Sequence, residues 1–492
     1  MIEGLTHYWL LCIFAIPAIS ACVAAIPFKN YALRNKALVI LSFLGLASAS
    51  LFCYDCLHLG DQFEVSLFPM LKNVNFAFKT TKHGLTFLFF VFLLHPISTL
   101  YTTSYLESTK APNRAEFMMF FNIAFMSMFG LLLAENMLVM FIFYELITLS
   151  TYPLIIFSRN KESKSAGRYY LYYLVGASTA LLFPAILAIY YLTGSLSFVH
   201  DGNLLANALQ QGHITKLQVN ILVMAVFFGC AKAAMFPFHK WLLKAMAAPT
   251  PVSAILHAVV VVKGGVFFIA MTLYSIFGKH FLEENLYSFQ SHNIITYISV
   301  FTIIFASCVA FTHSHIKKRL AYSTIAQLSY VLLTLSLFTA HSFDVAIVQM
   351  IAHSFGKITL FFGAGAIYII NHNYDIRKIT KLWHKSPSVS LAMLFGCLSI
   401  VGLPPAIGFY AKYYMLLNAM QDADLFVMFV IIVGSLLSAG YLMGILYPIF
   451  FVSEDDITKQ TESDSKISFG IAASIISLCF IMVFLPFVFN II

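Results

Sequence analysis

The chain has 492 residues, of which 60% are hydrophobic and only 10% are charged, and its mean hydropathy is +0.86. Soluble domains usually carry about 25% charged residues and about 45–50% apolar residues. The composition therefore excludes a soluble globule, a disordered chain and a disulfide scaffold, and it indicates a membrane protein. The formal net charge of +8 does not indicate nucleic-acid binding, because no basic run exceeds three residues.

Apolar windows predict fourteen membrane-spanning helices, since one span needs roughly 20 apolar residues. In chain order the expected spans are 7–27, 37–57, 84–104, 116–134, 136–157, 168–193, 219–238, 252–276, 294–312, 322–340, 344–371, 388–416, 425–452 and 467–491. We therefore expect an all-α polytopic membrane protein.

The loops between these spans differ in charge, which predicts their orientation. The odd-numbered loops carry twenty lysines and arginines, whereas the even-numbered loops carry five, which are Lys72, Lys79, Lys82, Lys216 and Lys279. Cytoplasmic loops carry the excess of cations in membrane proteins. We expect odd-numbered loops in the cytoplasm and both termini on the external side of a bacterial inner membrane. The last odd-numbered loop, 453–466, is acidic, but acids count little in this rule.

The cysteines do not predict a metal or cofactor site. Six of the eight lie in apolar stretches, where cysteine is usually a small buried apolar residue. Cys53 and Cys56 form a CxxC pair, but His58 follows one position too late for a haem-attachment motif. We expect no cofactor, no metal and no redox chemistry in this chain.

Apart from charged residues that stand near span ends, such as Asp55, Arg168 and Asp344, five charged residues lie inside the expected spans. They are Glu145, Lys232, Lys263, Lys357 and Lys412. A charge at the bilayer centre costs about 2.5–3.5 kcal/mol, so the five together cost roughly 12–18 kcal/mol unless they pair or face water. A desolvated lysine can exchange protons near neutral pH. The set therefore predicts a proton relay; the alternative is that the lysines snorkel, or that one forms an inert pair with Glu145.

Two histidines accompany the lysines. His353 precedes Lys357 by four residues, which places both side chains on one helix face. His257 shares a span with Lys263. We expect both histidines to take part in proton transfer; the alternative is that each is a packing residue.

Two spans carry helix-breaking residues close to a lysine. Lys232 is followed by Pro237, and the stretch Gly402–Pro405 is followed by Lys412. Proline removes a backbone donor, and membranes tolerate such breaks where protein or water satisfies the freed carbonyls. Interrupted helices at matching places in two halves of a chain indicate an inverted-repeat transporter. Ordinary kinked helices are the alternative.

At these residues the sequence resembles the proton-translocating antiporter-like subunits. The matching blocks are Glu135–Leu154, Lys232–Lys263, Ile316–Tyr330, His353–Gly365 and Leu398–Lys412. The chain looks most similar to the D-type subunits of multisubunit (Mrp-type) cation/proton antiporters. Subunits L, M and N of NADH:quinone oxidoreductase and their counterparts in membrane-bound hydrogenases are close relatives within the same family.

The resemblance implies two inverted five-helix repeats, formed by helices 4–8 and 9–13, with helices 7 and 12 broken. The expected organisation is 1–110 for the N-terminal helices, 111–280 for the first repeat, 281–455 for the second repeat and 456–492 for the last helix.

The resemblance also implies a role for each ionisable residue. Glu145 and Lys232 would form the pair between helices 5 and 7, and Lys263 would be the central lysine with His257 as its neighbour. His353 and Lys357 would form the helix 11 relay, and Lys412 would be the terminal lysine. One departure is Lys244, where many relatives have aspartate.

The expected function is that of a proton-translocating subunit of a monovalent cation/proton antiporter. Its partners would be other membrane subunits, protons and Na+, with no nucleic acid. A proton-pumping subunit of a redox-driven complex and a proton-coupled subunit of an inorganic-carbon uptake complex remain open. A purely structural scaffold, which would not need buried lysines, is the alternative from another class.

Overall fold

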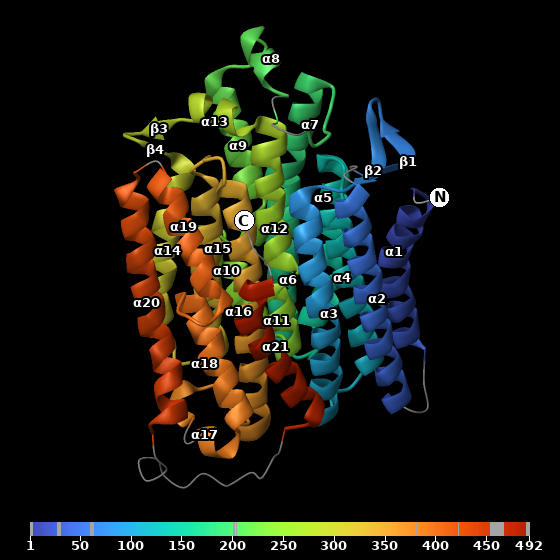
Figure 1. The fold of residues 1–492 in the computed structure, drawn as a ribbon, viewed down its shortest axis with the longest axis vertical. Coiled ribbons are helices and arrows are strands. Elements are labelled where there is room, and N and C mark those ends of the chain that lie inside the picture. Colours follow the sequence, from blue (N-terminus) through green and yellow to red (C-terminus); the bar gives the residue numbers. More distant parts are fainter. Residues whose placement is uncertain are drawn as a thin grey trace. The chain divides into compact units, whose positions relative to one another are not determined.

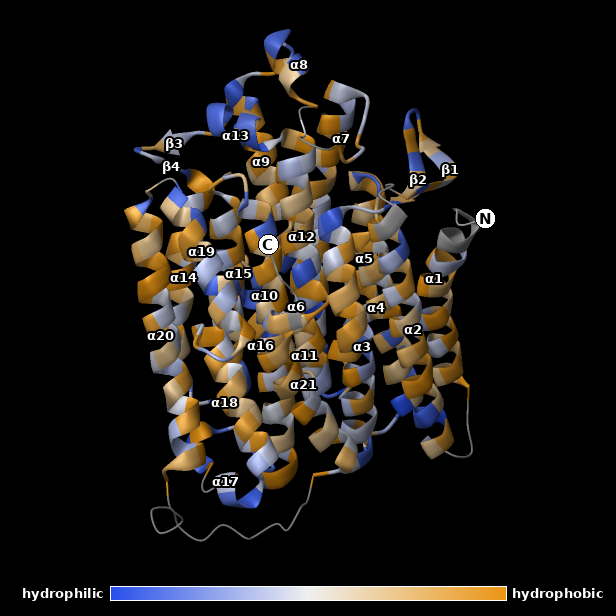
Figure 2. Ribbon diagram, in the orientation of Figure 1, coloured by the Kyte–Doolittle hydropathy of each residue, from blue (hydrophilic) through white to orange (hydrophobic). Residues whose placement is uncertain are grey.

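The computed structural model of the protein describes residues 3–26, 31–59, 63–199, 202, 204–379, 382–421, 423–452 and 467–488. The described chain is almost entirely helical (Figure 1). Figure 2 shows apolar residues along most of these helices, whereas α13 and α17 are mostly hydrophilic. The acidic loop 453–466 lies outside the described residues.

Eleven helices of the described chain are long and apolar enough to cross a membrane. They coincide with eleven of the fourteen spans expected from the sequence. The other three expected spans, 219–238, 322–340 and 388–416, are also helical, but two are interrupted and the third is less apolar. The all-α polytopic fold class is therefore confirmed.

The chain divides into two compact units. Unit 1 consists of residues 1–96, 115–241 and 260–297, and unit 2 of residues 97–114, 242–259 and 298–492. Unit 1 contains, whole or in part, α1 (Glu3–Ala25), α2 (Tyr31–Leu59), β1 (Glu64–Leu71), β2 (Val74–Lys79), α3 (Lys82–Ser108), α4 (Arg114–Leu132), α5 (Met137–Ile155), α6 (Lys161–Ala177), the π-helix η1 (Ser178–Leu182), α7 (Phe183–Thr193), α8 (Ala206–Gln210), α9 (Lys216–Gly229), η2 (Ala231–Ala233), α10 (Lys240–Lys244), α12 (Val261–Thr272), the π-helix η4 (Leu273–Phe277), α13 (Lys279–Asn285), β3 (Ser288–Phe289) and β4 (His292–Asn293).

Unit 2 contains the ends of α3 and α10 and, whole or in part, the remaining elements. They are η3 (Ala245–Ala247), α11 (Thr250–Ala258), α14 (Ile294–Thr312), α15 (Ile316–Leu335), α16 (Ser342–Asn371), η5 (Ile376–Lys378), α17 (Leu382–Lys385), α18 (Pro387–Val401), α19 (Ile407–Gln421), α20 (Leu425–Phe450) and α21 (Phe469–Val488). Its central element is α16, which packs against α11, α15, α18, α19 and α21.

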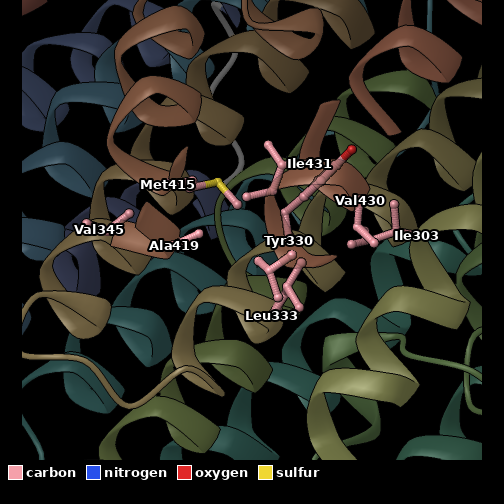
Figure 3. Packing of buried hydrophobic residues seen from close by; sticks show 9 residues of the cluster. Ile303, Tyr330, Leu333, Val345, Met415, Ala419, Val430 and Ile431 are labelled. Atoms are coloured by element: carbon pink, nitrogen blue, oxygen red, sulfur yellow. The ribbon is translucent and has the colours of Figure 1, made fainter. Parts of the chain in front are cut away.

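Part of the core of unit 2 is a cluster of apolar side chains from five helices (Figure 3). Its members are Ile303, Tyr330, Leu333, Val345, Met415, Ala419, Val427, Val430 and Ile431. Each is at most 4% exposed. The cluster fixes α15 against α19 and α20, which matters because α19 carries Lys412.

A short antiparallel hairpin, which the sequence analysis did not predict, joins two helices of unit 1. Strands β1 and β2 pair from Glu64 opposite Lys79 to Leu71 opposite Val74. Asn73 turns the chain with a φ of 63°, a left-handed conformation that asparagine tolerates better than most residues. A salt bridge of 3.3 Å between Lys79 Nζ and Glu64 Oε2 closes its open end.

Both predicted helix breaks are present. In unit 1, α9 ends at Gly229, Lys232 lies in the 3₁₀ turn η2, and α10 begins at Lys240. In unit 2, α18 ends at Val401 and α19 begins at Ile407. A third interruption was not predicted: the span expected at 252–276 leaves the helical path at Val259 and Val260, between α11 and α12.

Candidate functional site

Glu145 and Lys232 lie together in unit 1. Lys232 Nζ lies 3.7 Å from Glu145 Oε1, and the lysine side chain is fully buried while that of Glu145 is 18% exposed. A buried lysine would otherwise be an unpaired charge in an apolar interior, which is costly. The pairing therefore contradicts the snorkelling alternative for Lys232.

The broken backbone around Lys232 is satisfied by protein groups. Trp241 Nε1 donates a 2.9 Å hydrogen bond to the carbonyl of Ala231, which has left the helical ladder. Helix α12 approaches this turn closely at Gly265, where an added Cβ would lie 2.4 Å from the backbone nitrogen of Ala233. Only glycine fits such a close approach, so α12 packs directly against the turn that carries Lys232.

Lys263 lies on α12 in the same unit and is fully buried. Helix α12 packs against η2 and α5, the elements that carry Lys232 and Glu145. Unit 1 thus holds three of the predicted relay residues: Glu145, Lys232 and Lys263.

His353 and Lys357 lie on α16 in unit 2, as their spacing predicts, and both are buried. Lys357 Nζ donates a 3.1 Å hydrogen bond to the carbonyl of Leu320 on α15. In the described part of the chain, no carboxylate lies within ion-pair distance of Lys357. Its charged form is therefore solvated by a backbone dipole and not by a counter-ion.

His257 lies on α11 in unit 2 and is fully buried. Its ring centroid lies 4.9 Å from that of Phe361 on α16. Within the described residues neither ring nitrogen has a hydrogen-bond partner. Buried polar groups normally have a hydrogen-bond partner, so His257 departs from that rule at both ring nitrogens within the described chain.

Lys412 is the sixth residue of α19, which begins at Ile407, and it is 6% exposed. Its Nζ donates a 2.6 Å hydrogen bond to Ser435 Oγ on α20. At the end of α18, the free carbonyl of Ile400 accepts a 3.3 Å hydrogen bond from Gln327 Nε2. That carbonyl lacks its helical donor because residue 404 is proline.

Gln327 is itself fixed by a second glutamine. Gln349 Nε2 donates to Gln327 Oε1 at 2.9 Å. Gln349 lies one helical turn before His353 on α16. A continuous polar contact therefore connects the histidine-bearing face of α16 with the break in α18.

One buried lysine was missed by the sequence analysis. Lys317 stands in a basic run, which predicts a cytoplasmic loop, but it is 2% exposed in the first turn of α15. Its Nζ donates to the carbonyls of Met246 at 2.8 Å and Ala248 at 2.6 Å. Charge count alone gave no signal that this lysine would be buried.

No group of three or more histidine, cysteine, aspartate or glutamate side chains gathers in the described residues. The ionisable groups described above are buried side chains of types that can gain or lose a proton, and the fold that holds them is that of a polytopic membrane protein.

Most of the chain matches a known protein family. Residues 134–438 match the model of the NADH:quinone oxidoreductase/Mrp antiporter transmembrane family. The matched range covers Glu145, Lys232, Lys263, Lys357 and Lys412. The chain belongs to this family.

Similar curated proteins include subunits of quinone oxidoreductases. The chain is 31% identical to NAD(P)H-quinone oxidoreductase chain 5 of Picosynechococcus over 64% of this chain and 46% of the relative. It is 30% identical to NADH-quinone oxidoreductase subunit L of Rickettsia conorii over 87% of this chain and 64% of that protein. The chain therefore spans about half to two thirds of the length of these curated relatives.

Two solved structures share the fold. A chain of the archaeal membrane-bound sulfane sulfur reductase has a TM-score of 0.81 and 22% identity, covering 98% of this chain and 94% of its own. A chain of the Mrp complex from Dietzia has a TM-score of 0.81 and 18% identity, covering 99% and 94%.

Proposed function

We propose that this protein translocates protons across a bacterial inner membrane as one subunit of a multisubunit complex. One observation carries the proposal: Lys232, Lys263, Lys357 and Lys412 are all buried, and each is at most 6% exposed. Intramembrane ionisable residues are costly and usually functional. Family membership supports the same conclusion.

The Glu145–Lys232 pair is the part of the chain that would control proton release. A nearby carboxylate stabilises the charged lysine. When the two groups separate, the lysine loses that stabilisation and gives up its proton more readily. Lys263 lies on the helix packed against this turn, so it is the natural acceptor within unit 1.

His257, His353, Lys357 and Lys412 would continue the transfer in unit 2. His257 lies six residues before Lys263 in the chain, on the other side of the third helix interruption. Neutral lysine and histidine can each accept a proton and pass it on, whereas a permanently charged group cannot. We propose that these seven residues carry the proton.

The first candidate for the driving process is exchange of protons for a monovalent cation such as Na+. Its support is the similarity in fold to a chain of the Mrp complex over nearly the whole length of both chains. Lysine at position 412 fits the D-type, L-type and N-type patterns alike, so it does not separate this candidate from the next one.

A second candidate is proton pumping driven by a redox reaction elsewhere in the complex. The observation that favours it is the sequence identity of about 30% with subunits 5 and L of quinone oxidoreductases. Since we expect no redox group in this chain, other subunits would supply the electron transfer.

A vesicle assay separates the two candidates. Everted membrane vesicles from cells that express the complex are loaded with a fluorescent pH probe. If the complex is an antiporter, a NaCl pulse collapses a preformed pH gradient in vesicles that contain the chain but not in vesicles lacking it. If the complex is redox-driven, oxidation of NADH or another electron donor builds a pH gradient in vesicles that contain the chain. In that case NaCl has no specific effect on the gradient. Absence of both responses would contradict proton translocation.

A further inference from the structure

Each of the two lysines next to the helix breaks lies close to the face of a tyrosine ring. Lys232 Nζ lies 3.1 Å from the centroid of the Tyr144 ring, and Lys412 Nζ lies 4.9 Å from the centroid of the Tyr330 ring. Both rings are fully buried. A cation within about 6 Å of an aromatic face is attracted by the ring quadrupole, most strongly where water is excluded.

The same arrangement is built once in each unit. In unit 1, Tyr144 comes from α5 and Lys232 from the broken segment that follows α9. In unit 2, Tyr330 comes from α15 and Lys412 from α19, which follows the break after α18. In both cases an earlier, unbroken helix supplies the ring and the interrupted segment supplies the ammonium. A chance contact would not be expected to recur at both breaks.

Each ring is held firmly by its surroundings. Tyr144 packs edge-on against Phe268 with centroids 5.6 Å apart, and its hydroxyl oxygen accepts a 3.4 Å hydrogen bond from the backbone N–H of Lys232. Tyr330 lies in the apolar cluster of unit 2, among Met415, Ile431, Val430 and Ile303 (Figure 3).

Room for the Tyr330 hydroxyl is made by a glycine. An added Cβ at Gly434 would lie 2.0 Å from Tyr330 Oη. Neither ring can rotate away without disturbing its neighbours, so each presents a fixed face to its lysine.

The two lysines differ in their other contacts. Lys232 is also paired with Glu145, and Cys230 lies near it at the end of α9. Lys412 has a hydroxyl partner, Ser435 on α20. Among the described residues, no carboxylate lies within 4 Å of Lys412 Nζ. Charged Lys232 is therefore stabilised by both a carboxylate and an aromatic face. Charged Lys412 has no carboxylate within that distance, so it is stabilised by the Tyr330 ring and the Ser435 hydroxyl.

We propose that Tyr144 and Tyr330 are positioning residues for proton transport, each holding the ammonium group of the adjacent lysine on its ring face at the helix break. The ring attracts the charged lysine and not the neutral amine. Protonation therefore draws the side chain onto the ring, and loss of the proton frees it to move. The proposal deepens the proposed function and rests on it.

The first test separates the ring from the hydroxyl. Tyr330→Phe keeps the aromatic face, and we expect transport near the wild-type rate. Tyr330→Leu removes the face, and we expect a fall of roughly tenfold or more in initial rate, as a desolvated cation–π contact implies. The transport rate should fall less in Tyr144→Leu than in Tyr330→Leu, because Glu145 still pairs with Lys232. Tyr101→Leu, which removes a buried ring stacked on Phe362, is the matched control and should transport normally per assembled complex.

A second series keeps the shape of the ring while weakening its negative face. Phenylalanine with one, two and three ring fluorines is introduced at position 330 by stop-codon suppression in the full chain. Transport in everted vesicles, normalised to assembled complex, should fall stepwise with fluorination. Equal transport across the series would overturn the proposal, even where Tyr330→Leu fails to assemble. A loss in Tyr330→Phe as large as in Tyr330→Leu would also overturn it.

The same assay tells this proposal apart from the proposed function. Lys232→Ala and Lys412→Ala are measured beside the tyrosine variants. If both alanine variants transport normally, proton translocation through these lysines is wrong and the tyrosine proposal falls with it. If the alanine variants are inactive while the fluorinated series stays flat, only the role of the tyrosines is overturned.

Discussion

Lys232 Nζ and Glu145 Oε1 lie 3.7 Å apart in a buried part of unit 1, and no second carboxylate in the described chain pairs with this lysine. The distance is longer than that of a tight hydrogen-bonded pair. An ion pair of this length can be opened by a small movement, and in the proposed mechanism this opening lets Lys232 release its proton.

The first prediction follows from this pair. Glu145→Gln and Lys232→Ala should each abolish proton transport in everted vesicles, with assembly unchanged. The double variant should lose no more than either single variant, because residues that act as a unit are strongly non-additive. Independent, multiplicative losses would show that the two residues do not work together.

The second prediction concerns the backbone contact at the second break. A Cβ at Gly408 would lie 1.7 Å from the carbonyl oxygen of Ser399, so Gly408→Ala must displace α19 and with it Lys412. We expect a loss of about 1–3 kcal/mol in stability, as overpacking usually costs, and a loss of transport. Thermal unfolding in detergent measures the first effect.

The matched control for that prediction is Gly176→Ala on α6, where nothing lies within 4 Å of an added Cβ. This variant should unfold at the wild-type temperature or slightly above it. Equal melting temperatures for Gly408→Ala and Gly176→Ala would show that α18 and α19 are not held as tightly as the structure indicates.

The third prediction is a pH dependence of stability outside the spans. Burial, with Lys317 and Lys318 close by, lowers the pKa of His315 from 6.5 to about 4; Asp375 opposes this shift and the Tyr374 ring stacks on the imidazole. Between pH 6.5 and 4 the unfolded chain binds a proton at this site that the folded chain does not. Stability therefore rises with pH across this window and is lost as the pH falls through it.

The measurement is the melting temperature of the purified protein at pH 7 and at pH 5. His315→Gln should narrow the difference between the two temperatures, because glutamine does not titrate. If the difference in melting temperature between pH 7 and pH 5 were unchanged in His315→Gln, other groups would be responsible for the acid sensitivity.

The fourth prediction is topological and rests on the twenty-to-five distribution of loop cations. A reporter fused in the loop at Arg159–Lys164 should report a cytoplasmic location, and one fused after Ile492 an external location. Reversed signals at both positions would show that the predicted orientation, and with it the direction of proton entry, is wrong.

The sequence was sufficient to predict the helical fold and most of the candidate residues. Apolar windows of span length are a strong signal, and charges inside them are rare enough to stand out, which is why Glu145 and the four lysines were identified. The breaks beside Lys232 and Lys412 were visible because proline and glycine mark them directly.

The remaining features depend on contacts that a single sequence does not reveal. The interruption at Val259 and Val260 occurs in a run of valines without proline or glycine, so no local signal marks it. Tyr144 and Tyr330 look like ordinary apolar-span aromatics until the structure places a lysine on each ring. Lys317 stands in a basic run, and only tertiary packing buries it.

The central claim is that the intramembrane lysines must gain and lose protons, and substitution by arginine tests it most directly. Arginine keeps a positive charge but is effectively never deprotonated in proteins. Proton transport by Lys263→Arg and Lys412→Arg is measured in everted vesicles containing equal amounts of assembled complex, with Lys263→His and Lys412→His as titratable controls. The account predicts that both arginine variants lose most transport and that the histidine variants recover more of it. Near-normal transport by both arginine variants would contradict the account.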